Sequence, residues 1–195
     1  MAVDTTDWEL PILGEPVPVE LANTRYRDGA GVVDFLANPF LADRWFRESP
    51  TASKLARPRR WSAPGWIRLV ELRNAADVLL RARIDGGRAD PWTVAHLNSI
   101  AALASCAPEL RWDGEQDVRR VERLIAGDQT DALLGTVAHL TIALLAGADA
   151  MLLRVCGNDD CQMLFLKTHH RRRWCHNTCG HRHRQAKYYR SRNHA

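Results

Sequence analysis

The chain has 195 residues, of which 46% are hydrophobic and 26% charged, a composition that excludes a globally disordered protein. Residues 1–155 carry 18 Lys and Arg against 21 Asp and Glu, a net charge of −3, whereas residues 156–195 carry 9 against 2, a net charge of +7. A short basic segment behind a mildly acidic body is typical of a nucleic-acid-binding appendage, and a solubilising tail is the simpler alternative.

The N-terminal residues show no sign of export. Met1–Leu10 is acidic and lacks the apolar core of a secretory signal, which favours a cytoplasmic protein. The opening to about Pro18 is rich in proline and is expected to wrap the surface. Val17–Thr24 begins with Val alternating with polar residues, a pattern that predicts a short strand or the entry from a strand into a loop.

Two segments precede the longer helices. Gly31–Phe46 is expected to be helical in two pieces divided at Asn38-Pro39, because the residue before a proline avoids the helical region. Ser49–Arg60 is polar and basic, and it is expected to form an exposed loop.

Three longer helices have clearer signals. Ser62 and Pro64 begin the first, whose apolar residues recur three and four positions apart until Gly86-Gly87. Asp90-Pro91 supplies an N-cap and a first-turn proline for the second. The third, about Thr130–Ala146, is apolar around much of its surface and ends at Gly147. It predicts a helix at the centre of a bundle rather than a membrane span, so no membrane partner is expected.

The segment Leu110–Leu124 is ambiguous. Trp112-Asp113-Gly114 indicates a hairpin turn, whereas Val118, Val121 and Leu124 are spaced as on a helix. We expect a hairpin that runs into the start of a helix. Cys106, which follows the apolar positions of the second helix, is expected to be a buried and unreactive thiol.

The other four cysteines form two close pairs, Cys156 with Cys161 and Cys175 with Cys179, separated by thirteen residues. This spacing suits four thiolates around one tetrahedral Zn²⁺, and paired cysteines in a reducing compartment bind metal more often than they form disulfides. Four thiolates leave no open coordination position, so the zinc is expected to be structural. Metal binding would supply much of the folding free energy of so small a module, on the order of 10 kcal/mol.

The order of the ligands predicts how this module folds. Gly157–Asp160 is a turn that presents the first pair as a zinc knuckle, and the second pair lies four residues apart on one face of a terminal helix that runs to about Arg192. A knuckle, a hairpin and ligands at a helix N-terminus form a treble clef. The expected fold class is α+β, with a mostly helical domain over residues 1–150 and a small treble-clef zinc finger over residues 151–195.

Two stretches of the chain resemble the CGNR zinc-finger family of bacteria. Arg173-Trp174-Cys175 and Cys179-Gly180-His181-Arg182 follow a first cysteine pair and an LFL stretch, with His181 in place of the asparagine of the motif. Val19–Thr24 is similar to the LDFVNT-like start of the N-terminal domain of that family, named ABATE and described as a stress-induced transcription regulator. The resemblance covers nearly the whole chain and implies a DNA-binding finger behind a domain that senses a small molecule or forms a homodimer. It also makes Asn23, Thr24 and Arg25 candidate ligand-binding residues, although side-chain hydrogen bonds that fix a turn explain Asn and Thr more simply.

The basic residues around the second cysteine pair are the candidate DNA contacts. They lie on several faces of the expected helix, which favours binding to phosphates over reading of base edges. Tyr188 and Tyr189 can stack on unpaired bases or pack against the body, and Trp174 is expected to form the small core of the module. The candidate contacts are Arg171, Arg172, Arg173, His181, Arg182, Arg184, Lys187, Arg190 and Arg192.

The function that these observations favour is a zinc-dependent DNA-binding transcription regulator. An RNA- or ribosome-associated zinc protein and an adaptor whose basic tail docks an acidic partner are the alternatives. No nucleophile–base–acid set, glycine-rich phosphate loop or pair of catalytic carboxylates occurs, so no enzyme is expected. A nuclease that uses His169 or His170 with His181 or His183 would need an acidic residue nearby for a second metal, and none is present.

Overall fold

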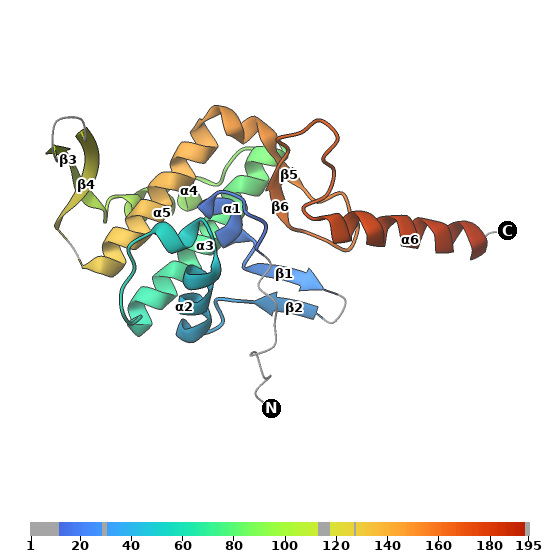
Figure 1. Ribbon diagram of the computed structural model, residues 1–195, viewed down its shortest axis with the longest axis horizontal. Helices are drawn as coiled ribbons and strands as arrows, with labels where there is room; N and C mark the ends of the chain where they lie inside the picture. Colours follow the sequence, from blue (N-terminus) through green and yellow to red (C-terminus); the bar gives the residue numbers. More distant parts are fainter. Residues whose placement is uncertain (1–11, 29–30, 113–117, 127, 194–195) are drawn as a thin grey trace.

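The computed structural model describes residues 12–28, 31–112, 118–126 and 128–193 (Figure 1). Helices form the body of the molecule, a β-hairpin extends from one end, and the C-terminal helix extends from the other. The body contains α1 (Val17–Ala22), α2 (Pro39–Glu48), α3 (Ala63–Ile84), α4 (Pro91–Ala101) and α5 (Gln129–Ala146), with short 3₁₀ turns at Ala52–Lys54 and Ala148–Leu152.

The starts of the three longer helices are confirmed. The Ser62 hydroxyl accepts a hydrogen bond from the Gly65 amide at 3.1 Å, and the Asp90 carboxylate accepts one from Thr93 at 2.9 Å. The third helix begins one residue before the predicted Thr130, at Gln129, because Asp128 caps it. The first of these helices, α3, ends before Gly86, whose φ of +65° is the left-handed conformation that glycine adopts most readily.

Helix α5 lies in the core of the body. It is long and apolar enough to cross a membrane, yet eight of its residues are buried, including Leu133, Leu134 and Val137. Its closest approach is at Gly135, where a Cβ atom would lie 2.3 Å from the Cβ of Ala104. The prediction of a helix at the centre of a bundle is confirmed.

The strand predicted over Val17–Thr24 is wrong, because residues 17–22 form the short helix α1. All six of its residues are buried, so the alternation of Val with other residues does not mark a solvent face. The buried Glu20 carboxylate accepts hydrogen bonds from the backbone amides of Leu13 and Glu15, at 2.9 and 2.7 Å. Glu20 is therefore a buried residue that holds the preceding backbone, not a residue on the exposed side of a strand.

The first helical piece predicted within Gly31–Phe46 is also wrong. Gly31–Asp34 forms β2, which pairs antiparallel with β1 (Arg25–Asp28). The φ of Gly31 is +146°, which is incompatible with a helix. The break at Asn38-Pro39 is confirmed, since α2 begins at Pro39 and Asn38 caps it. The predicted exposed loop at 49–60 contains one 3₁₀ turn and buries Ser49, Ala52 and Pro58.

The hairpin predicted around Trp112 is confirmed, but the helix predicted after it is wrong. β3 (Ser105–Trp112) pairs with β4 (Val118–Ala126) along its whole length, so cross-strand hydrogen bonding overrides the helical spacing of the valines. The turn residues Asp113 and Gly114 and the Cys106 side chain lie outside the described part of the structure.

The C-terminal region contains the hairpin of β5 (Leu153–Val155) and β6 (Leu164–Leu166), followed by α6 (Asn177–Asn193). The hairpin packs directly on the helical body. Its Leu153 and Leu164 share one hydrophobic cluster with Val19 of α1, Leu80 of α3 and Leu144 of α5. The C-terminal region is therefore continuous with the core of the helical part.

Candidate metal centre and nucleic-acid interface

Backbone hydrogen bonds at the end of the β5–β6 hairpin set the position of the first cysteine pair. The Cys161 amide donates to the Asn158 carbonyl at 2.8 Å, which closes the predicted turn. The Gly157 amide donates to the Arg173 carbonyl at 3.0 Å, and a Cβ on Gly157 would lie only 3.0 Å from the same oxygen. Glycine therefore lets the turn approach the segment that leads into Cys175.

The second pair lies at the beginning of α6. Cys175 precedes the helix and Cys179 lies in its first turn. The four Sγ atoms of the two pairs all lie within 4.8 Å of one another, with 3.7 Å between Cys161 and Cys175 and 3.6 Å between Cys175 and Cys179. A tetrahedral zinc with Zn–S bonds of about 2.3 Å needs sulfur atoms ~3.8 Å apart. The four free thiols therefore fit one zinc ion.

The cluster already favours negative charge on one sulfur. Hydrogen bonds from the thiols of Cys161 and Cys175 lower the pKa of Cys156 to about 2. The same interaction with Cys156 raises the pKa of Cys161 to about 12, and the pKa of Cys175 is also raised, first by Cys156. The thiols that keep their protons must lose them when zinc binds, so acid opposes metal binding.

Donors around the cluster point at the sulfurs. The Cys175 amide donates to Cys156 Sγ at 3.4 Å, and Arg182 Nη2 donates to Cys179 Sγ at 3.5 Å. Such N–H···S contacts stabilise thiolate ligands and fix their orientation. Arg182 is exposed as well, so one guanidinium touches both a ligand and the solvent.

The core of this module is small, as expected. The cysteines cluster with Met163 and Phe165, and the half-buried Trp174 packs against them. Gly180 makes room for the indole, because a Cβ there would lie 3.1 Å from Trp174 Cε3. The role predicted for Trp174 is confirmed.

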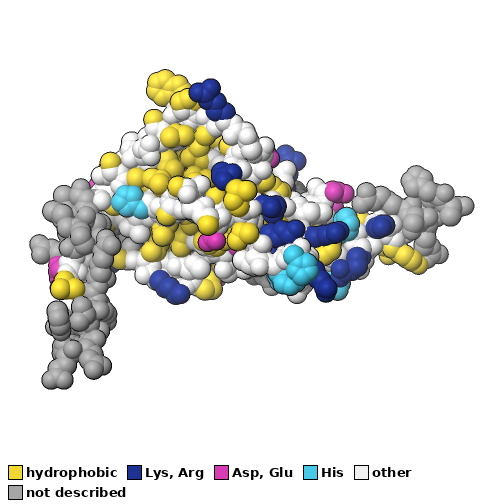
Figure 2. Space-filling model, turned by 90° about the horizontal axis from the view of Figure 1, so that it is seen from above, with side chains coloured by type: hydrophobic (Ala, Val, Ile, Leu, Met, Phe, Trp, Pro, Cys, Tyr) yellow, Lys and Arg dark blue, Asp and Glu magenta, His cyan; other side chains and the backbone are white. Residues whose placement is uncertain are grey.

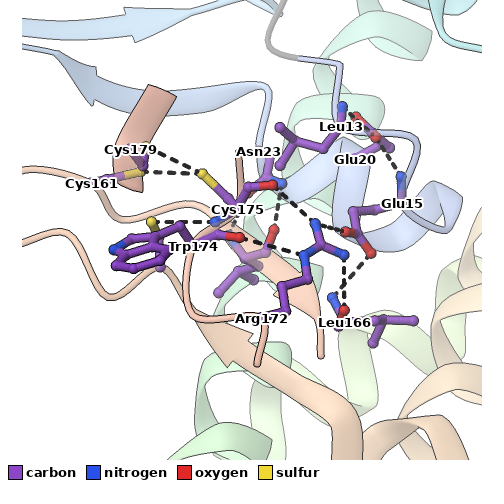
Figure 3. Close-up of polar contacts among 12 residues, drawn as sticks. Leu13, Glu15, Glu20, Asn23, Cys161, Leu166, Arg172, Trp174, Cys175 and Cys179 are labelled. Atoms are coloured by element: carbon purple, nitrogen blue, oxygen red, sulfur yellow. Dashed lines mark hydrogen bonds and ion pairs between the residues drawn. The ribbon is translucent and has the colours of Figure 1, made fainter. Parts of the chain in front are cut away.

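Several protein groups contact the guanidinium of Arg172, whose side chain is 27% exposed (Figure 3). Its Nη2 forms an ion pair of 2.7 Å with Glu15, whose side chain is 5% exposed, and also donates to the Cys175 carbonyl at 3.0 Å. Its Nη1 donates to the Leu166 carbonyl at 3.0 Å, and the guanidinium lies 4.7 Å from the centre of the Phe165 ring. The structure thus places this candidate DNA contact between the finger and the N-terminal segment rather than on the open surface.

Six of the other candidate contacts are exposed. Figure 2 shows Lys, Arg and His side chains gathered over the finger and the start of α6. Among the α6 residues whose side chains are described, Cys179 and Gly180 are buried and His183 and Ala186 are half-buried, at spacings of three and four residues that place them on one side of the helix. The side chains of Arg190 and Arg192 lie outside the described part. The exposed candidates are Arg171, Arg173, His181, Arg182, Arg184 and Lys187.

The candidate ligand residues of the N-terminal part separate into two groups. Asn23 is 2% exposed, and its amide donates to the Leu164 carbonyl at 2.9 Å and accepts from the Leu164 amide at 2.8 Å. Thr24 is fully buried and donates to the Leu21 carbonyl at 2.6 Å. Arg25 is exposed. The Asn23 side chain therefore forms a pair of hydrogen bonds with the backbone of β6, and no local sequence signal indicates this contact.

The histidines do not form a second metal site in the described residues. His169 and His170 lie together with ring centres 4.4 Å apart, whereas His183 faces Trp174. Within the described ranges, the four cysteines form the only group of three or more His, Cys, Asp or Glu residues that could hold a metal ion.

Comparison with protein families gives two matches along the chain. The ABATE family, described as "Putative stress-induced transcription regulator", matches residues 15–148, and the CGNR zinc finger matches residues 153–192. No curated protein matches the chain. These are regulator and zinc-finger families, and the finger with its four cysteines binds one structural zinc. The chain therefore belongs to the ABATE family and carries a CGNR zinc finger behind its ABATE domain.

Proposed function

We propose that this protein is a bacterial cytoplasmic transcription regulator that binds DNA through its zinc finger. In this proposal residues 151–195 form a treble clef that the zinc ion holds together, and residues 1–150 form the regulatory domain. The observation that carries the proposal is the set of exposed cations at the start of α6 and in the loop before it: Arg171, Arg173, Arg182, Arg184 and Lys187.

The position of these cations suits binding to phosphate. Arg171 and Arg173 line a pocket of about 440 Å³ together with His176 and Asn177, at the N-terminal end of α6 where peptide N–H groups favour anions. Arg182, Arg184 and Lys187 continue the positive surface along the helix. Contacts of this kind supply sequence-independent affinity through counterion release, so affinity should fall steeply with salt.

The test is a salt titration of DNA binding by the zinc-loaded protein, read as fluorescence anisotropy of a labelled duplex. The slope of log K against log salt is negative, and each lost phosphate contact reduces its magnitude by roughly 0.9. Replacing Arg173, Arg184 and Lys187 together by Ala should therefore reduce the magnitude of the slope by about 3 and weaken binding to all duplexes alike.

Arg44 in α2 provides the matched control, because it is an arginine of the helical body that pairs with Glu48 on the same helix. Arg44→Ala should leave the slope unchanged. Absence of salt-sensitive DNA binding by the zinc-loaded protein would contradict the proposal, as would a triple variant with the wild-type slope.

A second candidate is binding to single-stranded RNA. Tyr188 and Tyr189 are 57% and 64% exposed on α6, so they do not pack against the body, and exposed aromatic rings stack on unpaired bases. Competition between a single-stranded RNA and duplex DNA of equal length separates the two candidates. If RNA is preferred and Tyr189→Ala removes that preference, the protein is an RNA-binding regulator.

A further inference from the structure

A pocket of about 570 Å³ lies between the β1–β2 hairpin, α3 and the zinc knuckle. Gln162, which follows the ligand Cys161, forms part of its wall. The pocket is thus bounded by both the ABATE domain and the finger, and its volume is within the usual range of about 300–1,000 Å³ for small-molecule sites. Its lining includes Arg25, Arg27, Val32, Val78, Arg81 and Gln162.

Two of the arginines that line the pocket have no charged partner among the side chains that the structure describes. Of the pocket's four arginines, Arg73 forms a double ion pair with Asp34 at 2.9 and 3.0 Å, and Arg81 pairs with Asp77 at 2.9 Å. Among the residues whose side chains the structure describes, none forms an ion pair or a side-chain hydrogen bond with Arg25 or Arg27. They lie two residues apart on β1, so both side chains are on the same face of the hairpin.

The same pocket exposes apolar side chains. Val32, which is opposite Arg27 in the hairpin, is 51% exposed, and Val78 of α3 is 48% exposed. One exposed valine is ordinary on a protein surface, but here two valines and two guanidinium groups line the same pocket. The arginines suit a carboxylate or sulfonate, and the valines suit an apolar group attached to it.

We propose that this pocket binds a small organic anion, with its charged group on Arg25 and Arg27 and its apolar part against Val32 and Val78. The far wall links the pocket to the zinc centre, because Arg81 Nη2 donates to the Gln162 carbonyl at 2.9 Å, one residue from Cys161. Binding of the anion in the pocket would therefore affect the zinc finger through the hydrogen bond between Arg81 and Gln162. The coupling to DNA rests on the proposed function, whereas the binding of the anion does not.

The probe is 8-anilinonaphthalene-1-sulfonate, an anion with an apolar body whose fluorescence rises on binding, titrated into the zinc-loaded full chain. Naphthalene-2-carboxylate should displace it, and the neutral naphthalene-2-carboxamide of the same shape should not. The double variant Arg25→Gln/Arg27→Gln should bind the dye at least tenfold more weakly. Val78→Asn should weaken it as well, and Arg47→Gln, a change on the exposed part of α2, should have no effect.

Three outcomes would overturn the proposal: wild-type dye affinity in the double variant with its helical content intact, equal displacement by the carboxamide, or a signal that Val94→Asn removes instead. Val94 lines a separate apolar pocket of about 320 Å³ between α3, α4 and α5. None of these measurements contains DNA, so a failure of the salt titration would remove the coupling and leave the anion site standing.

Discussion

Arg172 and Arg173 are adjacent and chemically identical, yet the fold gives them different roles. Arg172 lies among the carbonyls of Leu166 and Cys175 and the carboxylate of Glu15, whereas Arg173 is exposed. An arginine whose donors are already satisfied by protein acceptors contributes to stability. An exposed one remains available for an external anion.

Arg172→Ala should therefore lower the free energy of unfolding and leave the DNA affinity of the folded protein nearly unchanged. It leaves the Glu15 carboxylate buried and unpaired, at a cost of about 2–4 kcal/mol, less than for a fully buried pair because Arg172 is partly exposed. Arg173→Ala should change stability little and lower DNA affinity. Urea denaturation of the zinc-loaded variants measures the first effect, and equal stabilities of the two variants would contradict the assignment.

Glu20 should make the stability depend on pH in a defined direction. Burial raises its pKa above the ordinary 4.5, and one of its carboxylate oxygens has no hydrogen-bond partner. The folded state then holds the proton more tightly than the unfolded state. This contribution is fully present below about 4.5 and is lost as pH rises through the folded pKa.

Glu20→Gln retains the oxygen that accepts from Leu13 and Glu15 and removes the buried charge. The stability of the variant relative to wild type should rise as pH increases from about 4.5, and then level off above the folded pKa. Urea denaturation across this range measures the difference, and zinc loss in acid affects both proteins alike. A pH-independent difference would show that the carboxylate does not titrate abnormally.

At the level of the elements, close helix packing sets a limit that helix propensity does not reveal. Gly135→Ala would improve the intrinsic helix propensity of α5 by about 1 kcal/mol. The new methyl group would, however, lie 2.3 Å from Ala104 Cβ and 2.5 Å from its backbone nitrogen. We expect a net loss of about 1–3 kcal/mol, measured by thermal denaturation. Gly87→Ala, whose Cβ would meet nothing closer than 3.8 Å, is the control and should be nearly neutral.

The elements that sequence predicted well are those whose determinants are local. Ser62 and Asp90 cap helices within three residues of themselves, and the four cysteines indicate zinc by spacing alone. The strand wrongly predicted over Val17–Thr24 has a remote determinant. α1 is stabilised by contacts of Asn23 with Leu164, 141 residues away, and no window of local sequence contains both partners.

Remote contacts also explain which parts of the candidate site the sequence does not reveal. Arg172 belongs to a run of three arginines that a charge count treats alike, and its partner Glu15 lies far along the chain. Arg25 is a candidate ligand-binding residue from its place beside Asn23 and Thr24, but only the tertiary structure shows that Arg27 and the exposed Val78 line the same pocket. Spacing locates metal ligands, whereas a pocket needs the tertiary structure.

At the level of the whole molecule, the finger and the ABATE domain share hydrophobic surface. The β5–β6 hairpin lies in one cluster with residues of α1, α3 and α5, and Glu15 and Asn23 both bind backbone groups of β6. Buried contacts of this kind couple the unfolding of the two parts, because one cannot open without exposing apolar surface of the other.

Chelation of zinc should accordingly destabilise the whole protein. Removing the metal releases Cys156, Cys161, Cys175 and Cys179, and with them the anchor of α6 and of the Arg172 loop. The hairpin then loses its constraint, and the cluster it shares with the body weakens. Circular dichroism at 222 nm should show one unfolding transition with zinc and a lower Tm for the helical body after chelation, reversed by added zinc. If the body instead unfolded at an unchanged temperature while only α6 melted early, the two parts would be thermodynamically independent, and the Asn23 and Glu15 contacts would not transmit stability between them.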